Sequence, residues 1–324
     1  MSVKLVVQVP CLNEESTLGE VLDSIPRKIE GFDSVYIVVI DDGSTDDTVK
    51  VAQKHGVTTI IRHRSTRGLA EAFRSGVDYA LTHGADVLVN TDGDNQYPQS
   101  DIPKLVKPIV DGDADIVIGD RRTHTIAHFS RGKKLLQKIG SKVVNAAAGT
   151  QIPDAASGFR AYSRTALFKL NLVTKFSYTM ETIIQAGYKR LAIQSVRVKT
   201  NPKTRESRLF KSTPEHVVKS AAAIIRSFLM YKPYSFFGTL GAVLGIAGLI
   251  PFIRYITISL LGIPGELIQS LLLGVSLLTA SLLAFALGVI ADLIRINRQL
   301  IEDGLAIHKA HQDVQSLSDN HRGK

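Results

Sequence analysis

Two carboxylates separated by a single residue follow an apolar segment that has the pattern of a β-strand. Asp92-Gly93-Asp94 comes directly after residues 86–91, so both acids leave the end of that segment on one short loop. Carboxylate oxygens at this spacing can approach one hard cation, which keeps open positions for the oxygens of a diphosphate. Most acidic pairs of this kind are solvated turn residues. Their position at a strand end, with Gln96 on the same loop, indicates a site for Mg²⁺ or Mn²⁺.

A second acidic segment ends another predicted strand. The apolar run at residues 35–40 stops at Asp41 and Asp42, turns at Gly43 and enters a predicted helix through residues 44–47. Carboxylates at such a strand end accept hydrogen bonds from a ribose or a base in other nucleotide-binding α/β folds. A turn followed by a helix N-cap with acids in its first turn explains residues 44–47 equally well. That simpler interpretation gives no reason for two adjacent acids, Asp41 and Asp42, at the strand end.

Short β-branched runs alternate with segments of helical period over residues 1–120, which predicts a Rossmann-like, mostly parallel α/β sheet covered by helices. The predicted strands are residues 3–9, 35–40, 57–61, 86–91 and 115–118. The predicted helices are one after a Ser16 cap and those at residues 45–55, 68–82 and 98–110. Ligands bind at the carboxyl ends of such strands, where Asn13-Glu14 and both acidic segments lie. Residues 121–210 are less regular, and we expect them to cover that edge on the acceptor side.

Two long segments lack charged residues altogether. Residues 233–253 and 267–291 contain no Asp, Glu, Lys or Arg, and each meets the length of about 20 residues needed to cross a bilayer. Basic residues precede and follow the pair, so the positive-inside rule predicts that both flanking parts are cytoplasmic. Gly241 and Gly245 form a step that allows close helix packing, and a homo-oligomer through the membrane helices is a further expectation.

The segment before the first membrane helix is predicted to be amphipathic. Residues 211–232 place apolar side chains at helical spacing with Lys219 and Arg226 between them, which fits a helix lying on the membrane surface. An ordinary helix packed on the soluble part is the alternative. The polar residues 296–324 are predicted to form a solvated cytoplasmic tail.

Composition narrows the partners. The net charge of +9 fits nucleic acid, anionic lipid or a phosphorylated substrate. Positive residues cluster near the membrane and acceptor segments without an interleaved aromatic platform, which disfavours nucleic acid. Cys11 is the one cysteine, so the sequence holds neither a disulfide framework nor a thiol cluster for zinc. Cys11 and the scattered histidines are interpreted as structural or solvated.

Six segments follow the order that is typical of one enzyme family. They are Pro10-Cys11-Leu12-Asn13-Glu14-Glu15, residues 41–48, Gly68-Leu69-Ala70 with Gly76, Asp92-Gly93-Asp94-Asn95-Gln96-Tyr97-Pro98, Gly119-Asp120-Arg121, and Asp154 with Ser157-Gly158-Phe159-Arg160-Ala161. On these segments the chain resembles inverting family-2 glycosyltransferases of the A-type (GT-A) fold, in particular dolichyl- or undecaprenyl-phosphate mannosyl- and glucosyltransferases. The predicted membrane helices are similar to those of the membrane-anchored branch. Tyr97 stands where the family usually has histidine.

The resemblance implies roles for particular residues. The implied nucleotide-binding residues are Pro10, Leu12, Glu14, Asp41 and Asp42. The implied ligands of the metal and the diphosphate are Asp92, Asp94 and Gln96. The residues implied to act in catalysis are Asp94, Asp92, Arg121 and Glu181. Arg121 would face the donor sugar or the acceptor phosphate, and Glu181 would orient an arginine.

A basic segment further along is suited to an acceptor phosphate. The family usually has an Arg-rich G-x-S-K-L segment, whereas this chain has Thr204-Arg205-Glu206-Ser207-Arg208-Leu209 and lacks the glycine. Arg205, Ser207 and Arg208 can still grip a phosphate through charge-assisted hydrogen bonds. Arg131 belongs to another basic cluster, which suits either lipid phosphate or anionic headgroups.

The sequence therefore predicts a cytoplasmic GT-A catalytic domain at residues 1–210, divided at residue 120 into a nucleotide-sugar part and an acceptor part. The interfacial helix, a two-helix transmembrane hairpin at residues 233–295 and the tail follow. The predicted reaction moves a hexose from a nucleotide-sugar, of the GDP-mannose or UDP-glucose type, to a polyprenyl (dolichyl) phosphate, with inversion. It would occur at the cytoplasmic face of the cell membrane, in which the protein would be integral.

Two alternatives remain open at this stage. A processive membrane polysaccharide synthase would share the donor domain, but it typically adds a Q-x-x-R-W block and more membrane spans. The chain has no tryptophan. A non-catalytic membrane scaffold could keep the same fold, and the intact Asp92, Asp94 and Gln96 argue against it.

Overall fold

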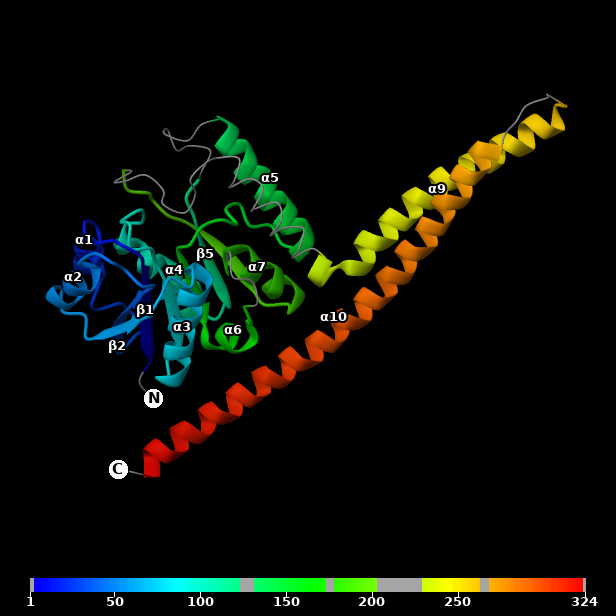
Figure 1. Ribbon diagram of the computed structural model, residues 1–324. Coiled ribbons are helices and arrows are strands. Elements are labelled where there is room, and N and C mark those ends of the chain that lie inside the picture. The colour runs from blue at the N-terminus through cyan, green and yellow to red at the C-terminus, as the bar shows by residue number, and fades with distance from the viewer. Residues whose placement is uncertain (1–2, 123–130, 173–177, 203–228, 263–267, 323–324) are drawn as a thin grey trace. The chain divides into compact units, whose positions relative to one another are not determined.

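The computed structural model describes residues 3–122, 131–172, 178–202, 229–262 and 268–322. Within these ranges it describes the backbone alone at residues 131–136, 306 and 308–322. The chain forms two compact units, residues 1–224 with 303–324 and residues 225–302 (Figure 1). The first unit contains a central sheet covered by helices, and the second is a helical hairpin.

Within the described residues, the sheet has seven strands in the order β3-β2-β1-β4-β6-β5-β7. Their bounds are β1 (Lys4–Cys11), β2 (Ser34–Asp41), β3 (Thr59–Arg62), β4 (Val87–Asn90), β5 (Ile116–Asp120), β6 (Arg160–Ser163) and β7 (Ile193–Arg197). β6 is antiparallel to β4 and β5, and every other pairing is parallel. The predicted mostly parallel sheet is confirmed. Two of its strands, β6 and β7, come from residues 121–210, so that part of the chain joins the same sheet.

Helices cover both faces of the sheet. They are α1 (Leu18–Ser24), α2 (Thr48–Lys54), α3 (Leu69–Thr82), the short 3-10 helix η1 (Gln99–Asp101), α4 (Ile102–Val110), α5 (Arg131–Ala148), α6 (Arg164–Lys169) and α7 (Tyr178–Tyr188). Alternate residues of β1 point to opposite faces. Leu5, Val7 and Val9 join a buried cluster with α1 and α4, whereas Gln8 points toward Gly76 on α3. α1 begins at Leu18, later than the Ser16 cap predicts.

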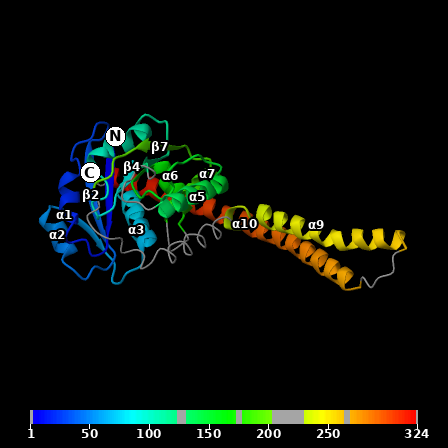
Figure 2. The same ribbon diagram turned by 90° about the horizontal axis from the view of Figure 1, so that it is seen from above.

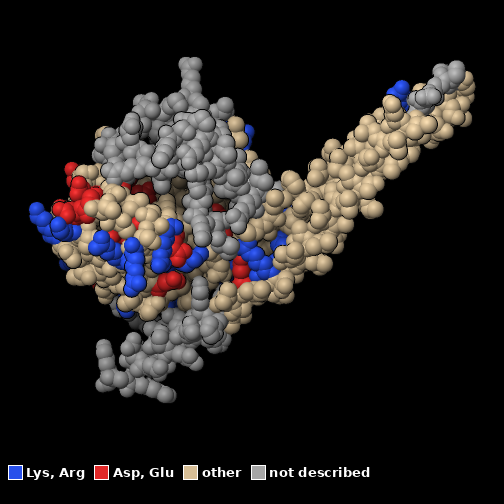
Figure 3. Space-filling view, in the orientation of Figure 1, with Lys and Arg blue, Asp and Glu red and all other residues tan. Residues whose placement is uncertain are grey.

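The second unit consists of α9 (Pro233–Leu260) and the first part of α10 (Ile268–Arg322). Both helices are long and apolar enough to cross a membrane. At 1.5 Å per residue the 28 residues of α9 reach about 42 Å, more than a hydrocarbon core of about 30 Å. Charged side chains gather near the ends of the hairpin (Figure 3). α10 is continuous, so the predicted boundary at residue 295 falls inside a helix.

Small residues bring the two membrane-length helices together. An added Cβ at Gly241 would lie 3.0 Å from the Phe285 ring, and one at Gly245 would lie 3.0 Å from Ser281 Oγ. The Ser281 hydroxyl donates a hydrogen bond of 2.7 Å to the Gly241 carbonyl. The predicted glycine step is thus used within the chain. The predicted interfacial helix lies outside the described residues, except for residues 229–232.

Candidate active site

The polar segments singled out in the sequence meet at one edge of the sheet. β1, β2, β4 and β5 run in the same direction, and Cys11 at the end of β1 pairs in register with Asp41 at the end of β2. β6 runs the other way, so Arg160 at its beginning pairs with Asn90 at the end of β4. The loops after four strands and the loop before a fifth therefore converge.

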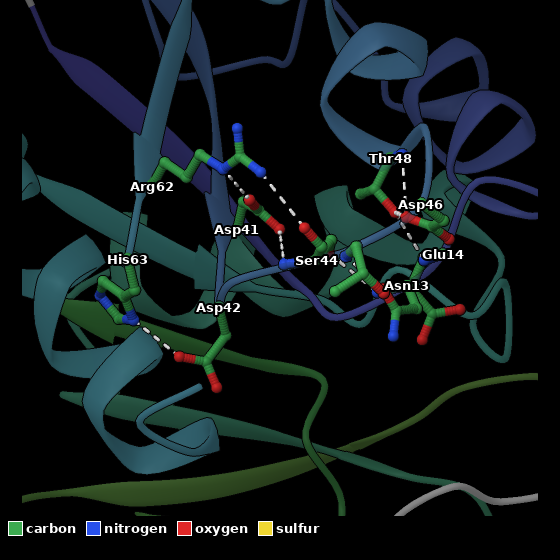
Figure 4. Close-up of polar contacts among 10 residues, drawn as sticks. Asn13, Glu14, Asp41, Asp42, Ser44, Asp46, Thr48, Arg62 and His63 are labelled. Atoms are coloured by element: carbon green, nitrogen blue, oxygen red, sulfur yellow. Dashed lines mark hydrogen bonds and ion pairs between the residues drawn. The ribbon is translucent and has the colours of Figure 1, made fainter. Parts of the chain in front are cut away.

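The loops after β1 and β2 are interlocked by hydrogen bonds (Figure 4). The Asn13 backbone N–H donates to Ser44 Oγ (2.9 Å), and the Thr45 backbone N–H donates to Asn13 Oδ1 (2.8 Å). The Glu14 backbone N–H donates to Thr48 Oγ1 (2.8 Å). Asn13 has a φ of +56°, a left-handed conformation that asparagine tolerates better than most residues. Much of this motif chemistry therefore holds two loops in place.

Asp41 is buried and lies between a backbone amide and an arginine. Its Oδ1 accepts a hydrogen bond from the Ser44 backbone N–H (2.9 Å), and its Oδ2 lies 3.0 Å from Arg62 Nε. The Arg62 side chain is 60% exposed and also donates to the Ser44 carbonyl oxygen. Arg62 was not predicted from the sequence. It ends β3, the strand next to β2, and this position in register with Asp41 is the signal that could have identified it.

Asp42 points to the loop between β3 and α3. Its carboxylate accepts hydrogen bonds from the backbone N–H of Arg67 (2.9 Å) and of Gly68 (2.8 Å). Oδ1 also lies 2.7 Å from Nδ1 of buried His63, whose Nε2 lies 2.9 Å from Ser75 Oγ. Asp42 thus fixes the residues that lead into α3. Its part in nucleotide binding stays a prediction.

Asp92 lies in a different electrostatic setting. Burial, followed by the negative charge of Asp94, raises the pKa of Asp92 to about 7, and Glu14 adds to this effect while Arg121 opposes it. An added Cβ at Gly158 would lie 3.0 and 3.2 Å from the two Asp92 carboxylate oxygens. The Asp92 carboxylate therefore lies close to Gly158, and the neighbouring acids disfavour its ionised form.

The donor set at this loop fits a divalent cation. No group of three or more His, Cys, Asp or Glu side chains that could hold a metal ion occurs in the described parts of the chain. Mg²⁺ is commonly bound through one or two carboxylates plus the phosphates of a substrate, with water completing its shell. Asp92 and Asp94 supply such a pair. A cation there would offset the like charges that raise the pKa of Asp92.

Arg121 follows β5 and forms a buried, two-pronged ion pair. Its Nε lies 2.7 Å from Asp154 Oδ2, and its Nη2 donates to Asp154 Oδ1 at 2.9 Å. Its Nη1 lies 3.5 Å from Gln96 Oε1, on the loop that carries Asp92 and Asp94. A paired arginine therefore stands beside the acidic loop, and its guanidinium is oriented by Asp154.

Comparison with known proteins agrees with this geometry. The family model described as "Glycosyl transferase family 2" matches residues 6–170. The chain belongs to glycosyl transferase family 2. The match runs from within β1 to the end of α6 and includes both acidic loops, Arg121 and Asp154.

Two curated relatives of this family-2 glycosyltransferase have named activities. UDP-N-acetylglucosamine--dolichyl-phosphate N-acetylglucosaminyltransferase of Methanococcus voltae is 27% identical over 215 residues, which are 59% of this chain and 83% of the relative. Polyprenol monophosphomannose synthase of Mycolicibacterium smegmatis is 30% identical over 180 residues, which are 52% of this chain and 65% of the relative.

A solved structure shows the same fold. Glucosyl-3-phosphoglycerate synthase from Mycobacterium tuberculosis, in complex with Mn²⁺, UDP-glucose and phosphoglyceric acid, superposes with a TM-score of 0.55. It is 24% identical, and the match covers 70% of this chain and 79% of that one. The GT-A fold of the glycosyltransferase is thereby confirmed.

A buried network lies beneath the acidic loop of the glycosyltransferase. Asn90 donates to the Gly158 carbonyl (2.9 Å) and to the Tyr178 hydroxyl (2.8 Å), and accepts from Gln8 Nε2 (2.8 Å). The Gly158 backbone N–H donates to the Tyr97 hydroxyl at 3.2 Å. Sequence reasoning missed Gln8, Asn90 and Tyr178. The register between β1 and β4 is the information that brings Gln8 to Asn90.

Arg160 is fully buried and is surrounded by oxygen atoms rather than solvent. It donates to the carbonyls of Ser157 (2.6 Å), Thr179 (2.7 Å) and Ala155 (2.8 Å), and to Thr182 Oγ1 (2.9 Å). These bonds join the loop of Asp154 to α7. Arg160 therefore supports, through that loop, the carboxylate that orients Arg121.

The remaining predicted residues are distributed as follows. Glu181 is buried in α7 and accepts a hydrogen bond from Gln185 Nε2 at 3.2 Å. Pro10 ends β1 beside Cys11, and Leu12 is 37% exposed. Burial, with Glu14 and Asp41 nearby, raises the pKa of the Cys11 thiol well above its usual value, so the thiol stays protonated. Arg131 begins α5, and Arg205, Ser207 and Arg208 lie outside the described residues.

Proposed function

We propose that the protein transfers a hexose from a nucleotide-sugar to a polyprenyl phosphate at the cytoplasmic face of a membrane, with inversion at the anomeric carbon. The donor would be of the GDP-mannose or UDP-glucose type. The observation that carries the proposal is the meeting of the half-buried Asp92 and Asp94 with the buried Arg121–Asp154 pair at the carboxyl edge of a GT-A sheet. The polyprenyl-linked activities named for two relatives support the choice of acceptor.

The nucleotide would lie along the interlocked loops. Pro10, Leu12, Glu14, Asp41 and Asp42 are the proposed residues of the nucleoside side. Asp41 faces that edge next to exposed Arg62, and its carboxylate oxygens are placed to accept hydrogen bonds. Asp42 would contribute by fixing the loop before α3.

Asp92, Asp94 and Gln96 are the proposed residues for Mg²⁺ or Mn²⁺ and the diphosphate. A metal bound there would act as a Lewis acid that offsets charge on the departing nucleoside diphosphate. The Mn²⁺ in the solved glucosyl-3-phosphoglycerate synthase supports this proposal. Arg121 is held by Asp154 and would orient either the donor sugar or the acceptor phosphate.

The displacement itself needs little proton chemistry. An oxygen of the lipid phosphate attacks the anomeric carbon, a new carbon–oxygen bond forms, and the bond to the nucleoside diphosphate breaks. A phosphate monoester is already largely ionised near neutral pH, so no residue has to remove a proton first. Positioning and charge then supply most of the rate. Glu181 accordingly fits a role in orienting an arginine better than that of a base.

The membrane hairpin favours an acceptor that is itself a membrane lipid. Near one end of the hairpin, Arg298 pairs with Glu302 (2.7 Å) and lies over the Tyr231 ring, whose centroid is 5.2 Å away. Tyrosine and arginine are residues that anchor helices at the water interface. This end would be cytoplasmic. Arg131, Arg205, Ser207 and Arg208 are the proposed contacts of the acceptor phosphate, and a homo-oligomer through the membrane helices stays a prediction.

The proposal is tested by transfer to lipid. The purified full chain is placed in nanodiscs with polyprenyl phosphate and Mn²⁺ and is offered radiolabelled nucleotide-sugars one at a time. We expect label from one donor to enter the lipid extract, with transfer abolished in Asp94→Ala and retained in Asp113→Ala, a change of an exposed acid in a turn.

Each other outcome has a defined meaning. Label that appears only in polymer would support a polysaccharide synthase. Neither transfer nor hydrolysis of any donor, by a protein that is folded and inserted, would support a non-catalytic scaffold. Full turnover by Asp94→Ala would refute the role of the acidic loop.

A further inference from the structure

α5 presents two large apolar side chains to solvent on one side of the helix. Ile139 is 49% exposed and Val143 is 37% exposed, one helical turn apart. Lys138 and Lys142 are also exposed and are spaced by the same turn. Residues four apart lie on one side of a helix, so an apolar pair and a basic pair run side by side. We refer to these four residues as the outer face of α5.

The opposite side of α5 is firmly attached to the unit. Val144, Ala147 and Ala148 are buried, and an added Cβ at Gly187 of α7 would overlap the Ala148 carbonyl oxygen. Asn145 donates to the Ile152 carbonyl and accepts from the Ile152 backbone N–H, both at 2.9 Å. The helix therefore cannot turn to bury its outer face without losing these contacts.

Charge indicates what the outer face binds. α5 contains five Lys or Arg and no Asp or Glu over its 18 residues. Lysines beside exposed aliphatic residues suit an anionic bilayer, because the aliphatic groups enter the acyl boundary while the ammonium groups stay with the headgroups. Figures 1 and 2 show α5 beside α7, at the end of the unit opposite α1 and α2.

Two other helices of the chain would bring α5 near a membrane. α9 and α10 are long enough to cross a bilayer, so a protein inserted by them keeps its first unit tethered close to lipid. Tethering gives a high effective concentration, and even a weak surface then docks.

We propose that the outer face of α5 is a docking surface for an anionic lipid bilayer. Ile139 and Val143 enter the interface, and Lys138 and Lys142 contact lipid phosphates. The proposal rests on the membrane insertion that is part of the proposed function, but not on sugar transfer. It also has a consequence for the site, because the Ala155 backbone N–H donates to Ser141 Oγ of α5 at 3.2 Å. Asp154, which holds Arg121, is the preceding residue, so docking would support the acceptor side of the site.

Lipid quenching tests the surface directly. Ile139→Cys is labelled with a small fluorophore in the full chain and reconstituted into nanodiscs that contain anionic lipid with brominated acyl chains. The matched control is Tyr36→Cys on β2, where the native side chain is 46% exposed. Native Cys11 is buried, and its raised pKa keeps it unreactive. We expect bromolipid to quench the label at position 139 at least 2-fold and to leave the label at position 36 unchanged.

A charge reversal identifies the lipid component. Lys138→Glu with Lys142→Glu should weaken docking about 30-fold in anionic nanodiscs, as expected for two lysines near an anionic surface. Lys50→Glu with Lys54→Glu on α2 makes the same charge change on another exposed helix and should leave quenching at position 139 unaltered. Docking of the protein that keeps Lys138 and Lys142 should also weaken when neutral lipid replaces anionic lipid.

Three results would overturn the proposal. Quenching of the position 139 label by aqueous iodide, with none by bromolipid, would leave the face in water. Protection that persists in detergent would mean that another segment of the chain covers it. Protection that rises with the number of chains per nanodisc would identify a second copy as the occupant. If the native chain transfers no sugar from any donor while bromolipid still quenches the label at position 139, the proposed function is refuted and the docking surface is supported.

Discussion

The two acidic loops at the edge of the sheet use their carboxylates in different ways. On the nucleotide side, Asp42 accepts backbone N–H groups and faces His63, and Asp46 accepts the backbone N–H of Thr48 (3.0 Å) and of Glu15 (3.3 Å). On the proposed metal side, Asp92 is half-buried and lies near the like charge of Asp94. One set of acids is satisfied by the fold, and the other is placed at an electrostatic cost.

The difference is visible in the direction of the pKa shifts. Burial acts to raise the pKa of Asp46, but hydrogen bonds from the hydroxyl and backbone N–H of Thr48 outweigh it and leave that pKa lowered. Burial and Asp94 raise the pKa of Asp92 to about 7. The comparison teaches that acids in one family motif can build the scaffold, while Asp92 in another is held near a like charge that a cation would offset.

The largest expected effect comes from neutralising the metal side. Asp92→Asn should lower turnover about 100- to 1,000-fold, because it removes a proposed metal ligand and its charge, and the metal would offset the charge that develops on the leaving group. Mn²⁺ binding, followed by electron paramagnetic resonance on the protein in nanodiscs, should weaken in parallel. Asp113→Asn, in an exposed turn, is the control. Unchanged Mn²⁺ affinity in Asp92→Asn would contradict the assignment.

The same substitution should change how the metal-free protein responds to pH. A raised pKa means that folded Asp92 holds a proton that the unfolded chain releases between about pH 4 and 7, so the unfolding free energy falls as pH rises through this range. Asp92→Asn removes that term. Thermal unfolding with a chelator present should show the variant gaining stability relative to the native protein from pH 5 to pH 8. Parallel curves would refute the shift.

The next largest effect should come from crowding the same carboxylate. In Gly158→Ala the new methyl would meet both Asp92 oxygens at about the distances given above, so the carboxylate must move. We expect turnover at subsaturating Mn²⁺ to fall about 10- to 100-fold, with partial recovery at high Mn²⁺. Gly140→Ala on α5 is the matched control, because an added Cβ there meets nothing within 4 Å. Equal activity of both variants would show that the site tolerates the displacement.

These contrasts explain what the sequence could and could not predict. The first five strands were predicted because they are apolar, β-branched runs, whereas β6 (RAYS) and β7 (IQSVR) are short and partly polar. Motifs located the acids, but spacing alone does not tell an acceptor of backbone N–H groups from a metal ligand. That distinction for Asp42 depends on the β3–α3 loop, 21 to 26 residues away. The Arg121–Asp154 pair likewise spans 33 residues.

A smaller effect, mainly on stability, is expected on the nucleotide side. Asp42→Asn keeps one acceptor oxygen and replaces the other by an N–H₂ group, which cannot accept either from Gly68 or from His63 and Arg67, so the unfolding free energy should fall by about 1–3 kcal/mol. Turnover, measured well below the melting temperature at saturating donor, should fall much less than in Asp92→Asn. A loss of turnover as large as that of Asp92→Asn, with unchanged stability, would place Asp42 in contact with the nucleotide and remove the contrast between the loops.

The smallest effect is expected at Asp46, and its pH dependence has the opposite sign to that of Asp92. A lowered pKa contributes stability above the unfolded value near 3.8, and this is lost as pH falls through the folded value below it. Asp46→Asn should therefore speed amide exchange of Thr48 and Glu15 a few-fold at pH 5 to 8, with the gap closing below about pH 4. Hydrogen-exchange mass spectrometry of both proteins measures this. A difference in exchange rate that widens in acid would mean that the pKa of Asp46 is raised, as that of Asp92 is. The two loops would then not differ in how they treat their carboxylates.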